Sequence, residues 1–313
     1  MTQPRVLFAG TPDFALASLR ALVGGGFVPI AVLTQPDRPA GRGKKLTQSP
    51  VKQFAIGQDI DVLQPQTLRE PDIVAELAAF RPDILVVAAY GLILPQEVLD
   101  IPRRGCVNVH ASLLPRWRGA APIQAAILNG DAQTGITLMS MTAGLDCGPV
   151  YATEALEIGA TETEGELHDR LAELGGRLLL RHFEDILDGS LATEAQDESQ
   201  ALYAPKIRKD DARIDWREPA PELERLVRAY NPVPGAWFDV DGQRVKCWRA
   251  SCVDAAAAAP GTVISADKNG IVVACAGGAL SLESLQRPGK GRVTGAEFAA
   301  AVDLQDRQLV LPQ

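Results

Sequence analysis

The chain has 313 residues, and 46% of them are hydrophobic, so it can form one large domain or two ordinary domains with real cores. Its formal net charge of −8 argues against a simple polyanion binder. The excess of acidic residues lies before residue 204, and the rest of the chain is close to neutral. Any contact with nucleic acid must therefore use local basic patches.

The five cysteines are scattered without C-x-x-C pairs, which argues against a disulfide framework and against a zinc site. The sequence has no run of about 18 apolar residues and does not begin with a charged-then-apolar pattern. We therefore predict a soluble protein of the cytoplasm, with no membrane partner and no bound metal.

The first elements predict a parallel sheet. Residues 5–9 form an apolar strand that ends at Gly10, and Asp13 is the expected cap of a helix that continues to Val23 before three glycines. Residues 29–34 predict a second strand, which completes a β-α-β unit. The turn Gly10-Thr11-Pro12 lacks the G-x-G-x-x-G fingerprint, which argues against a nicotinamide dehydrogenase.

Residues 35–49 predict a long loop that is rich in basic side chains. Arg38, Arg42, Lys44 and Lys45 stand there among prolines and glycines. One interpretation is a solvated surface loop without a binding role. The other is a flexible basic arm that contacts phosphates.

The middle of the chain predicts helices at 51–56 and 72–80 and strands at 61–63 and 83–89. Apolar and polar residues then alternate from Cys106 to His110 with period two, which predicts a short strand. Asn108 and His110 point to the same side of this strand, beside its carboxyl end. Open α/β sheets bind ligands at that edge.

Asn108 and His110 suggest acyl-type chemistry. A histidine gives or takes a proton near neutral pH, and an asparagine amide donates to an oxygen that becomes negative in a tetrahedral intermediate. A third polar group must orient or tune the histidine, and Asp146, in a loop with glycines and a proline, is the candidate. The alternative is that Asn108 and His110 only satisfy backbone groups at a strand end.

The last third of the chain has a different pattern. After a helix at 120–128, strands at 135–141 and 150–155 and a long helix at 163–187, residues 190–205 predict a polar linker. A helix at 222–229 and short β-prone pieces follow, with hairpin turns at Asp241-Gly242 and Asn269-Gly270. These pieces predict a small barrel, and hence two domains at 1–189 and 206–313.

The motifs in this order resemble a known family. Asn108-Val109-His110 is followed by Ser112-Leu113-Leu114-Pro115 and Arg118-Gly119, and Gly144-Leu145-Asp146 comes later. This signature is similar to that of the folate-dependent formyltransferases, and the resemblance continues through Asn231-Pro232 to the C-terminal segment. Thr142 and Cys147 depart from the pattern, because an acidic residue and a hydroxyl are common at these positions.

The resemblance implies a Rossmann-like, mostly parallel sheet and a smaller, OB-like β-barrel domain that binds tRNA. It implies transfer of the formyl group of 10-formyltetrahydrofolate to the amino group of methionyl initiator tRNA, for translation initiation. Asn108 would stabilise the oxyanion. His110 would stabilise the same intermediate and pass a proton toward the leaving folate nitrogen, and Asp146 would tune His110 and the attacking amine.

Two sets of binding residues follow from the same resemblance. The folate co-substrate would be bound by Ser112, Leu113, Leu114, Pro115, Tyr90, Gly91 and Leu92. The tRNA would be bound by Arg38, Arg42, Lys44, Lys45, Lys206, Arg208, Lys209 and Lys290. We expect the protein to be a monomer.

Three other functions compete with this expectation. Formylation of a small amine, such as a nucleotide sugar or glycinamide ribonucleotide, would use the same folate site, but the basic loop and the appended barrel favour tRNA. A non-catalytic RNA-binding protein on an inactive transferase domain is disfavoured because Asn108, His110 and Asp146 are all present. A metallohydrolase is disfavoured because His110 has no partner at ligand spacing.

Overall fold

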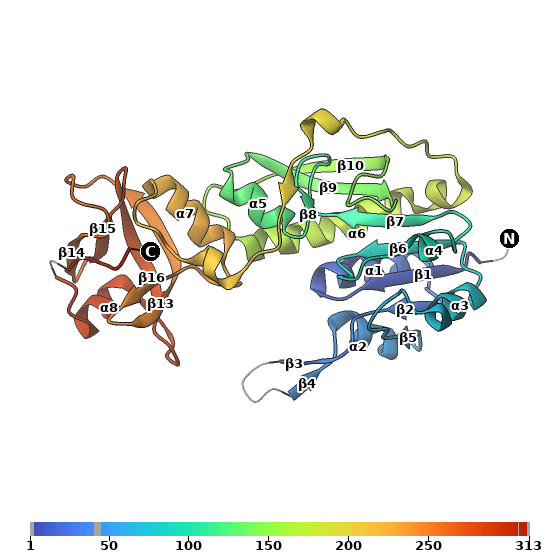
Figure 1. Ribbon diagram of the computed structural model, residues 1–313, viewed down its shortest axis with the longest axis horizontal. Helices are drawn as coiled ribbons and strands as arrows, with labels where there is room; N and C mark the ends of the chain where they lie inside the picture. The colour runs from blue at the N-terminus through green and yellow to red at the C-terminus, as the bar shows by residue number, and fades with distance from the viewer. Residues whose placement is uncertain (1–2, 41–44, 306, 312–313) are drawn as a thin grey trace. The chain divides into compact units, whose positions relative to one another are not determined.

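The computed structural model describes residues 3–40, 45–305 and 307–311 (Figure 1). The chain divides into two compact units whose segments alternate along the sequence. The first unit consists of residues up to Pro122, Gln133–Glu157 and His168–Ala204, and the second of Ile123–Ala132, Ile158–Leu167 and Pro205–Gln313. No helix among the described residues is long and apolar enough to cross a membrane.

A seven-stranded sheet in the order β10-β9-β7-β6-β1-β2-β5 forms the centre of the first unit. The strands are β1 (Val6–Gly10), β2 (Ala31–Leu33), β5 (Asp61–Leu63), β6 (Ile84–Ala88), β7 (Cys106–His110), β9 (Gln133–Ser140) and β10 (Val150–Glu157). The first five are parallel to one another, whereas β9 and β10 run antiparallel to their neighbours. The prediction of a mostly parallel sheet is confirmed.

Helices cover both faces of this sheet. They are α1 (Asp13–Gly24), α2 (Pro50–Gly57), α3 (Pro71–Ala79), α4 (Gln96–Leu99) and α6 (Glu164–Asp188). The short helix α5 (Pro122–Leu128) follows residues 111–121. One face of β1 contributes Leu7 and Ala9 to a core that also contains Leu77 of α3 and Leu99 of α4. On α6, Gly175 lies against Val109 of β7. Both faces of the strands are therefore buried, as the continuous apolar runs require.

Two helix starts test the predicted caps. Pro12, with no side-chain hydrogen bond, is the N-cap of α1, and Asp13 is the first helical residue, so the predicted Asp13 cap was wrong by one position. For α6 the sequence allowed either Thr161 or Thr163 as the cap, and the hydrogen bonds of Thr163 select it. Its backbone N–H donates to Glu166 Oε2 at 2.8 Å, and Glu166 N donates back to the Thr163 hydroxyl at 3.4 Å.

The segment predicted as a long loop contains regular structure. Strands β3 (Arg38–Ala40) and β4 (Lys45–Thr47) pair antiparallel, with Arg38 opposite Thr47. We missed this ladder because the segment lacks an alternating apolar face and contains several prolines and glycines. Arg42 and Lys44 lie outside the described residues.

The segment predicted as a linker packs against the first unit. Strand β11 (Tyr203–Ala204) pairs in parallel with β8 (Arg118–Gly119), after a 3₁₀ turn at Glu198–Gln200. Arg118 N donates to Leu202 O at 2.8 Å, and Leu202 N donates to Pro115 O at 3.2 Å. Residues 194–204, which we call the strap, therefore do more than connect two domains. The division at residues 190–205 stays a prediction.

The second unit is built on an antiparallel, barrel-like sheet in the order β12-β13-β16-β15-β14, with β17 paired to β16. The strands are β12 (Trp237–Val240), β13 (Gln243–Val253), β14 (Val263–Asp267), β15 (Gly270–Ala274), β16 (Ala279–Gln286) and β17 (Arg292–Thr294). Irregular register in β13 and β14 lets the sheet curl. The predicted turn at Asp241-Gly242 is confirmed, with φ values of 51° and 75°.

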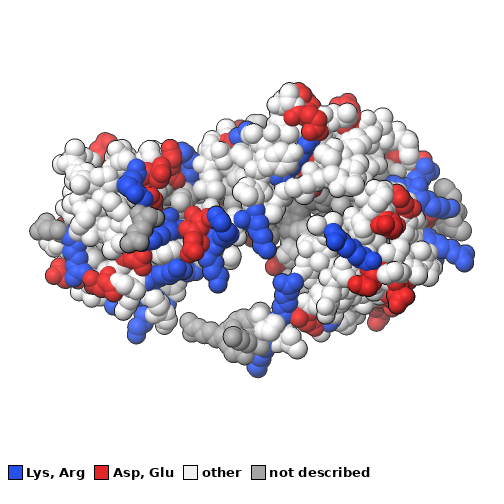
Figure 2. Space-filling model, in the orientation of Figure 1, with Lys and Arg blue, Asp and Glu red and all other residues white. Residues whose placement is uncertain are grey.

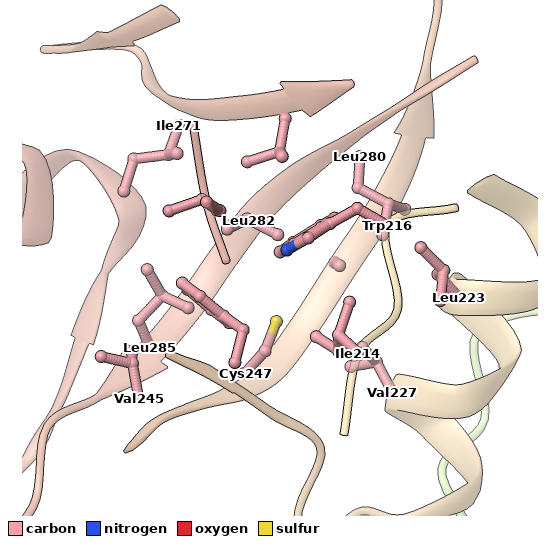
Figure 3. Close-up of a cluster of buried hydrophobic side chains, with 14 of the residues drawn as sticks. Ile214, Trp216, Leu223, Val227, Val245, Cys247, Ile271, Leu280, Leu282 and Leu285 are labelled. Carbon is pink, nitrogen blue, oxygen red and sulfur yellow. The ribbon is translucent and has the colours of Figure 1, made fainter. Parts of the chain in front are cut away.

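Figure 3 shows the core of this sheet around Trp216, whose side chain is fully buried. Leucines of β16, Cys247 of β13 and Val227 of α7 (Ala220–Ala229) surround the indole ring. Helix α8 (Gly295–Ala301) contributes Phe298 to the same core. The sequence pattern did not predict α8 or β17, since each is too short for its periodicity to be recognised.

Candidate active site

Strand β7 brings two of the predicted residues to the carboxyl edge of the sheet. It lies between β6 and β9, with Asn108 opposite Val87 on one side and Met139 on the other. Cys106 points into the apolar core on one face, and its burial raises the pKa of its thiol to about 12. The predicted strand has the predicted bounds, and Cys106 is a buried apolar residue.

Asp146, in the loop between β9 and β10, reaches both polar residues of β7. Its Oδ2 lies 3.8 Å from His110 Nδ1, and its Oδ1 lies 3.5 Å from Asn108 Nδ2. These distances are longer than strong hydrogen bonds, so the contacts are mainly electrostatic. The firm bond to the carboxylate comes from the backbone, because Gly119 N donates to Oδ2 at 2.8 Å.

The imidazole of His110 is 6% exposed and has a fixed orientation. Its Nε2 lies 3.0 Å from the carbonyl oxygen of Trp117. A carbonyl only accepts, so Nε2 must carry a hydrogen and donate it. Nδ1, which faces Asp146, is therefore the nitrogen that can gain or lose a proton at this site.

The loops around these side chains hold unusual backbone conformations. Ala89, Trp117 and Asp146 have φ values of 42°, 62° and 49°, a region that non-glycine residues rarely adopt. Each costs of order 1–3 kcal/mol, and such residues cluster at functional sites. Gly119 has φ of 114°, and a Cβ there would lie 2.6 Å from the carbonyl oxygen of Ala204, so only glycine fits.

Arg118 contributes a buried charge beside the site. Its side chain is 1% exposed, and its guanidinium forms two hydrogen bonds with Glu198, at 2.7 and 2.8 Å. Gln196 also accepts from Arg118, at 2.8 and 3.1 Å. We missed Gln196 and Glu198 because they lie in the predicted linker. Arg118 was the feature of the sequence that could have indicated them. It stands in an apolar stretch with Trp117 and two alanines, and a buried arginine needs a polar partner.

The two departures from the family signature touch each other. The hydroxyl of Thr142 lies 3.5 Å from Cys147 Sγ. Leu145, which lies between them in the sequence, is 62% exposed. The pair closes the loop that carries Asp146. Neither residue contacts His110 or Asn108 through a described hydrogen bond.

The residues predicted to bind folate lie in two segments of the first unit. Ser112 is fully buried, and its hydroxyl donates to Arg116 O at 2.6 Å, so this hydroxyl is already used within the protein. Leu113, Leu114 and Pro115 are half-buried. Leu114 N donates to Thr137 Oγ1 at 3.1 Å, and the Leu114–Pro115 bond is cis.

The second predicted folate segment follows β6. Tyr90 is buried, and its hydroxyl has no hydrogen-bond partner among the described residues, while burial raises its pKa. Gly91 is exposed with φ of 82°, and Leu92 is half-buried. Ile93, the next residue, is 75% exposed. The segment thus presents an exposed apolar side chain beside the exposed Gly91.

The residues predicted to bind tRNA are spread over both units. Arg38 and Lys45 lie on β3 and β4, where Arg38 donates to Gln35 Oε1 at 2.8 Å. The predicted basic residues of the second unit are all exposed: Lys206, Arg208, Lys209 and Lys290. Arg208 pairs with Asp211 at 3.3 Å, so part of its charge is neutralised.

A stronger cationic feature of the second unit was not predicted. Arg244 lies over the Trp237 ring at 4.0 Å, and Arg292 lies over the Trp248 ring at 4.0 Å. Lys246, opposite Trp237 in the β12–β13 ladder, is 4.9 Å from the Trp248 ring. Burial and the charge of Arg292 lower the pKa of Lys246. Figure 2 shows Lys and Arg side chains gathered on this unit, with acidic side chains among them.

Comparison with known proteins identifies the family of this chain. Residues 5–183 match the family described as formyl transferase, and residues 206–302 match the formyl transferase C-terminal domain. The chain belongs to the formyl transferase family. The methionyl-tRNA formyltransferase of Pseudomonas syringae pv. tomato is 57% identical to this formyl transferase over 290 residues, which cover 92% of each chain. That of Pseudomonas entomophila is 56% identical over 91% of this chain and 92% of its own.

Solved structures of lower identity share the fold of this formyl transferase. HypX from Aquifex aeolicus, crystallised with tetrahydrofolic acid, is 19% identical with a TM-score of 0.64, and the match covers 95% of this chain and 47% of HypX. The chain thus spans about half the length of HypX. An N-formyltransferase from Helicobacter canadensis, bound to folinic acid and dTDP-3-aminofucose, is 16% identical with a TM-score of 0.63, over 89% of this chain and 99% of its own.

Proposed function

We propose that this formyl transferase moves the formyl group of 10-formyltetrahydrofolate to the amino group of methionyl initiator tRNA, and that Asn108, His110 and Asp146 carry the reaction. The observation that supports it most is the meeting of these three side chains at the carboxyl edge of the sheet. The high identity to methionyl-tRNA formyltransferases supports the choice of substrate.

In the proposed reaction the methionyl amine attacks the formyl carbon and a tetrahedral intermediate forms. The amide N–H of Asn108 donates to the oxygen that becomes negative. The carbon–nitrogen bond to the folate then breaks, and the proton lost by the amine passes to the leaving nitrogen. His110 moves this proton through Nδ1, because Nε2 is held by Trp117 O.

Asp146 has the role of orienting partner in this proposal. Its carboxylate is fixed by Gly119 N at 2.8 Å and faces both Asn108 and His110. A negative charge at that place favours the cationic imidazole that forms during proton transfer. The same carboxylate can accept a hydrogen bond from the attacking amine.

The folate is assigned to the two loops that flank the trio. Gly91 and Leu92 offer backbone groups, and Tyr90 offers a buried hydroxyl without a partner among the described residues. The Tyr90 carbonyl already accepts from Thr11 and Gln35. Leu113, Leu114 and Pro115 offer apolar surface. Ser112 acts through its support of the loop, since its hydroxyl binds Arg116 O.

The tRNA is assigned to the basic residues of both units. The β3–β4 arm carries Arg38 and Lys45, and the sequence adds Arg42 and Lys44. In the second unit we add Arg244, Lys246 and Arg292 to the four predicted residues, because arginines stacked on tryptophan present their charge at a fixed place. Phosphates contacted by such residues fix the position of the RNA.

The proposal includes the arrangement of the protein. Residues 1–189 carry the catalytic groups, residues 206–313 bind tRNA through the barrel, and residues 190–205 join them. The protein acts as a monomer in the cytoplasm, where charged initiator tRNA is used for translation initiation.

The proposal is tested by incubating the protein with 10-formyltetrahydrofolate and charged initiator tRNA, then measuring formyl-methionine after hydrolysis of the ester. A nucleotide amino sugar serves as the competing acceptor. We expect formylation of the charged tRNA and none of the sugar. Formylation of the sugar alone would overturn the substrate assignment and leave the chemistry of the trio in place.

A further inference from the structure

We infer that Gln196 is a positioning residue for Asp146, and that it acts together with Arg118. The inference rests on the proposed function, because it takes Asp146 as a member of the reacting trio. Gln196 lies on the strap, 50 residues after Asp146 in the sequence. All the contacts involved lie within the first unit.

The side-chain amide of Gln196 joins two segments of the site. Its Nε2 donates to the carbonyl oxygens of Asp146, at 2.9 Å, and Gly148, at 2.7 Å. Its Oε1 accepts from Arg118 Nη2 at 2.8 Å and from Arg118 Nε at 3.1 Å. The two N–H groups and the two lone pairs of the amide are thus all used.

These partners leave only one orientation for the amide. The guanidinium of Arg118 has donors and no acceptor, and the two carbonyls accept only. A reversed amide would place its N–H groups against the guanidinium and its oxygen against both carbonyls. Gln196 is therefore fixed by the chemistry of its neighbours as well as by distance.

Arg118 gives this bridge a rigid base. Its guanidinium is buried, and Glu198 holds it with two parallel hydrogen bonds, which raise the pKa of Arg118 further above its ordinary value. A planar fork with both ends bound has little freedom to turn. The pKa of Glu198 is lowered by the same contact, so the pair stays charged at neutral pH.

Consecutive residues of β8 thus hold Asp146 at two points. Gly119 N donates to its carboxylate at 2.8 Å, and Arg118 reaches its carbonyl through Gln196. Asp146 also has a φ of 49°, a conformation that its neighbours must maintain. Without Gln196 the main chain of Asp146 loses this restraint, and the carboxylate can move relative to His110 and Asn108.

Removal of the amide leaves the strap itself in place. Glu194 and Val150 exchange two backbone hydrogen bonds, at 2.8 and 2.9 Å. Arg118 N donates to Leu202 O at 2.8 Å, and Ala120 N donates to Ala204 O at 2.9 Å. A variant of Gln196 therefore changes the bridge to Asp146 and not the fold of the segment.

Two variants separate the halves of the bridge. Gln196→Leu removes all four hydrogen bonds, whereas Gln196→Glu keeps the acceptor for Arg118 and removes the donors to Asp146 and Gly148. Gln200→Leu is the matched control, because Gln200 lies on the same strap and donates to Asp197 at 2.7 Å. Thermal unfolding establishes that each variant is folded before its rate is measured.

The measurement is single-turnover formylation of charged initiator tRNA, with the dissociation constant for the tRNA determined in parallel. A misplacement of about 1 Å can cost 10²-fold in rate, so we expect both Gln196 variants to be about 10- to 100-fold slower. We expect the dissociation constant to stay within about twofold of wild type, because the hydrogen bonds of Gln196 go to Arg118, Asp146 and Gly148 and to none of the residues assigned to the tRNA. Gln200→Leu should match the wild type.

A double-mutant cycle shows whether Gln196 acts through Asp146. In an Asp146→Asn background, Gln196→Leu should cost less than about threefold, because the group that it positions is already removed. Equal losses in both backgrounds, or wild-type rates in both Gln196 variants, would overturn the inference while the wild-type enzyme stays active. A wild-type chain that does not formylate the charged tRNA would overturn the proposed function and the inference together.

Discussion

The position of the Asp146 carboxylate depends on the backbone N–H of Gly119, which donates to it at 2.8 Å. Gly119→Ala should lower the free energy of unfolding by about 1–3 kcal/mol, because φ of 114° is strained for alanine and the new Cβ would meet Ala204 O. The transfer rate should fall as well, since Gly119 N would shift away from Asp146. Denaturant unfolding and single-turnover formylation measure the two effects.

Gly105→Ala is the control for this substitution. Gly105 has φ of 73°, and a Cβ there would meet nothing within 4 Å, so it isolates the conformational cost. An unfolding free energy for Gly119→Ala equal to that of Gly105→Ala would contradict the close contact at Ala204.

Local patterns predicted the residues of β7 and not those that support them. Period-two alternation places Asn108 and His110 on one face wherever the strand lies. Asp146 could be predicted because a carboxylate among glycines and a proline stands out in the sequence. Gln196 could not be predicted, since its partners lie 48 to 78 residues away and no periodicity links them.

At the scale of elements, a carboxylate joins the starts of β1 and β6. Asp83 accepts from Arg5 N at 2.7 Å and from Arg103 Nε at 2.9 Å, and the bond from Arg5 is the largest cause of its lowered pKa. Asp83→Asn should therefore lower the free energy of unfolding at pH 7 by about 1–2 kcal/mol.

The pH dependence of this effect has a definite sign. A carboxylate with a lowered folded pKa stabilises the fold above its ordinary value of 3.8, and the contribution is lost as the pH falls through the folded pKa. The difference in unfolding free energy between Asp83→Asn and wild type should shrink below about pH 4. Asp61→Asn, at the exposed start of β5, is the control. A difference that is constant with pH would contradict the assignment.

The β3–β4 arm is proposed to bind tRNA, and two of its basic residues, Arg42 and Lys44, are known from the sequence alone. Replacing Arg42 and Lys44 by alanine should weaken binding of charged initiator tRNA by several-fold, because each phosphate contact carries part of the affinity. Folate binding should not change. Arg69→Ala with Arg177→Ala removes the same charge from exposed positions of the first unit. Equal loss of folate and tRNA affinity would show that the arm shapes the catalytic unit.

The strands and helices were predictable where periodicity extends over a whole element. β5 and β7 have the predicted bounds, and α3 and α6 differ by one residue at each end. Short elements were not predicted, because β8 and β11 are set by pairing between distant segments and the β3–β4 hairpin has no alternating apolar face. Turn chemistry was reliable at Asp241-Gly242, where both residues adopt positive φ.

At the scale of the whole molecule, each compact unit is assembled from several segments of the chain. Residues 123–132 and 158–167 precede the predicted linker but cluster with the second unit. Leu128 packs against Tyr230 and Trp237, and Arg225 Nε donates to Leu128 O at 3.0 Å. A composition shift marks where a chain changes character, but it does not reveal that an earlier segment packs into a later unit.

Binding of tRNA should depend on salt despite the acidic total charge. If the arm and the basic residues of the second unit make about four to six phosphate contacts, log affinity should fall with log salt at a slope of about −3 to −5. Repulsion from the acidic residues is muted beyond about 10 Å at 0.1 M salt. Affinity for initiator tRNA measured over a range of salt concentrations decides it, and a flat or rising affinity would contradict the proposed surface.

The transfer rate of the His110→Asn variant tests the proposed trio most directly. Wild type and variant are compared in single-turnover formylation of charged initiator tRNA, with folate binding and thermal unfolding measured on the same samples. Asparagine cannot carry the proton that we assign to Nδ1, so the variant should bind folate, keep its fold and lose about 10²–10⁴ in rate. A folded variant that formylates at the wild-type rate would contradict the role of His110.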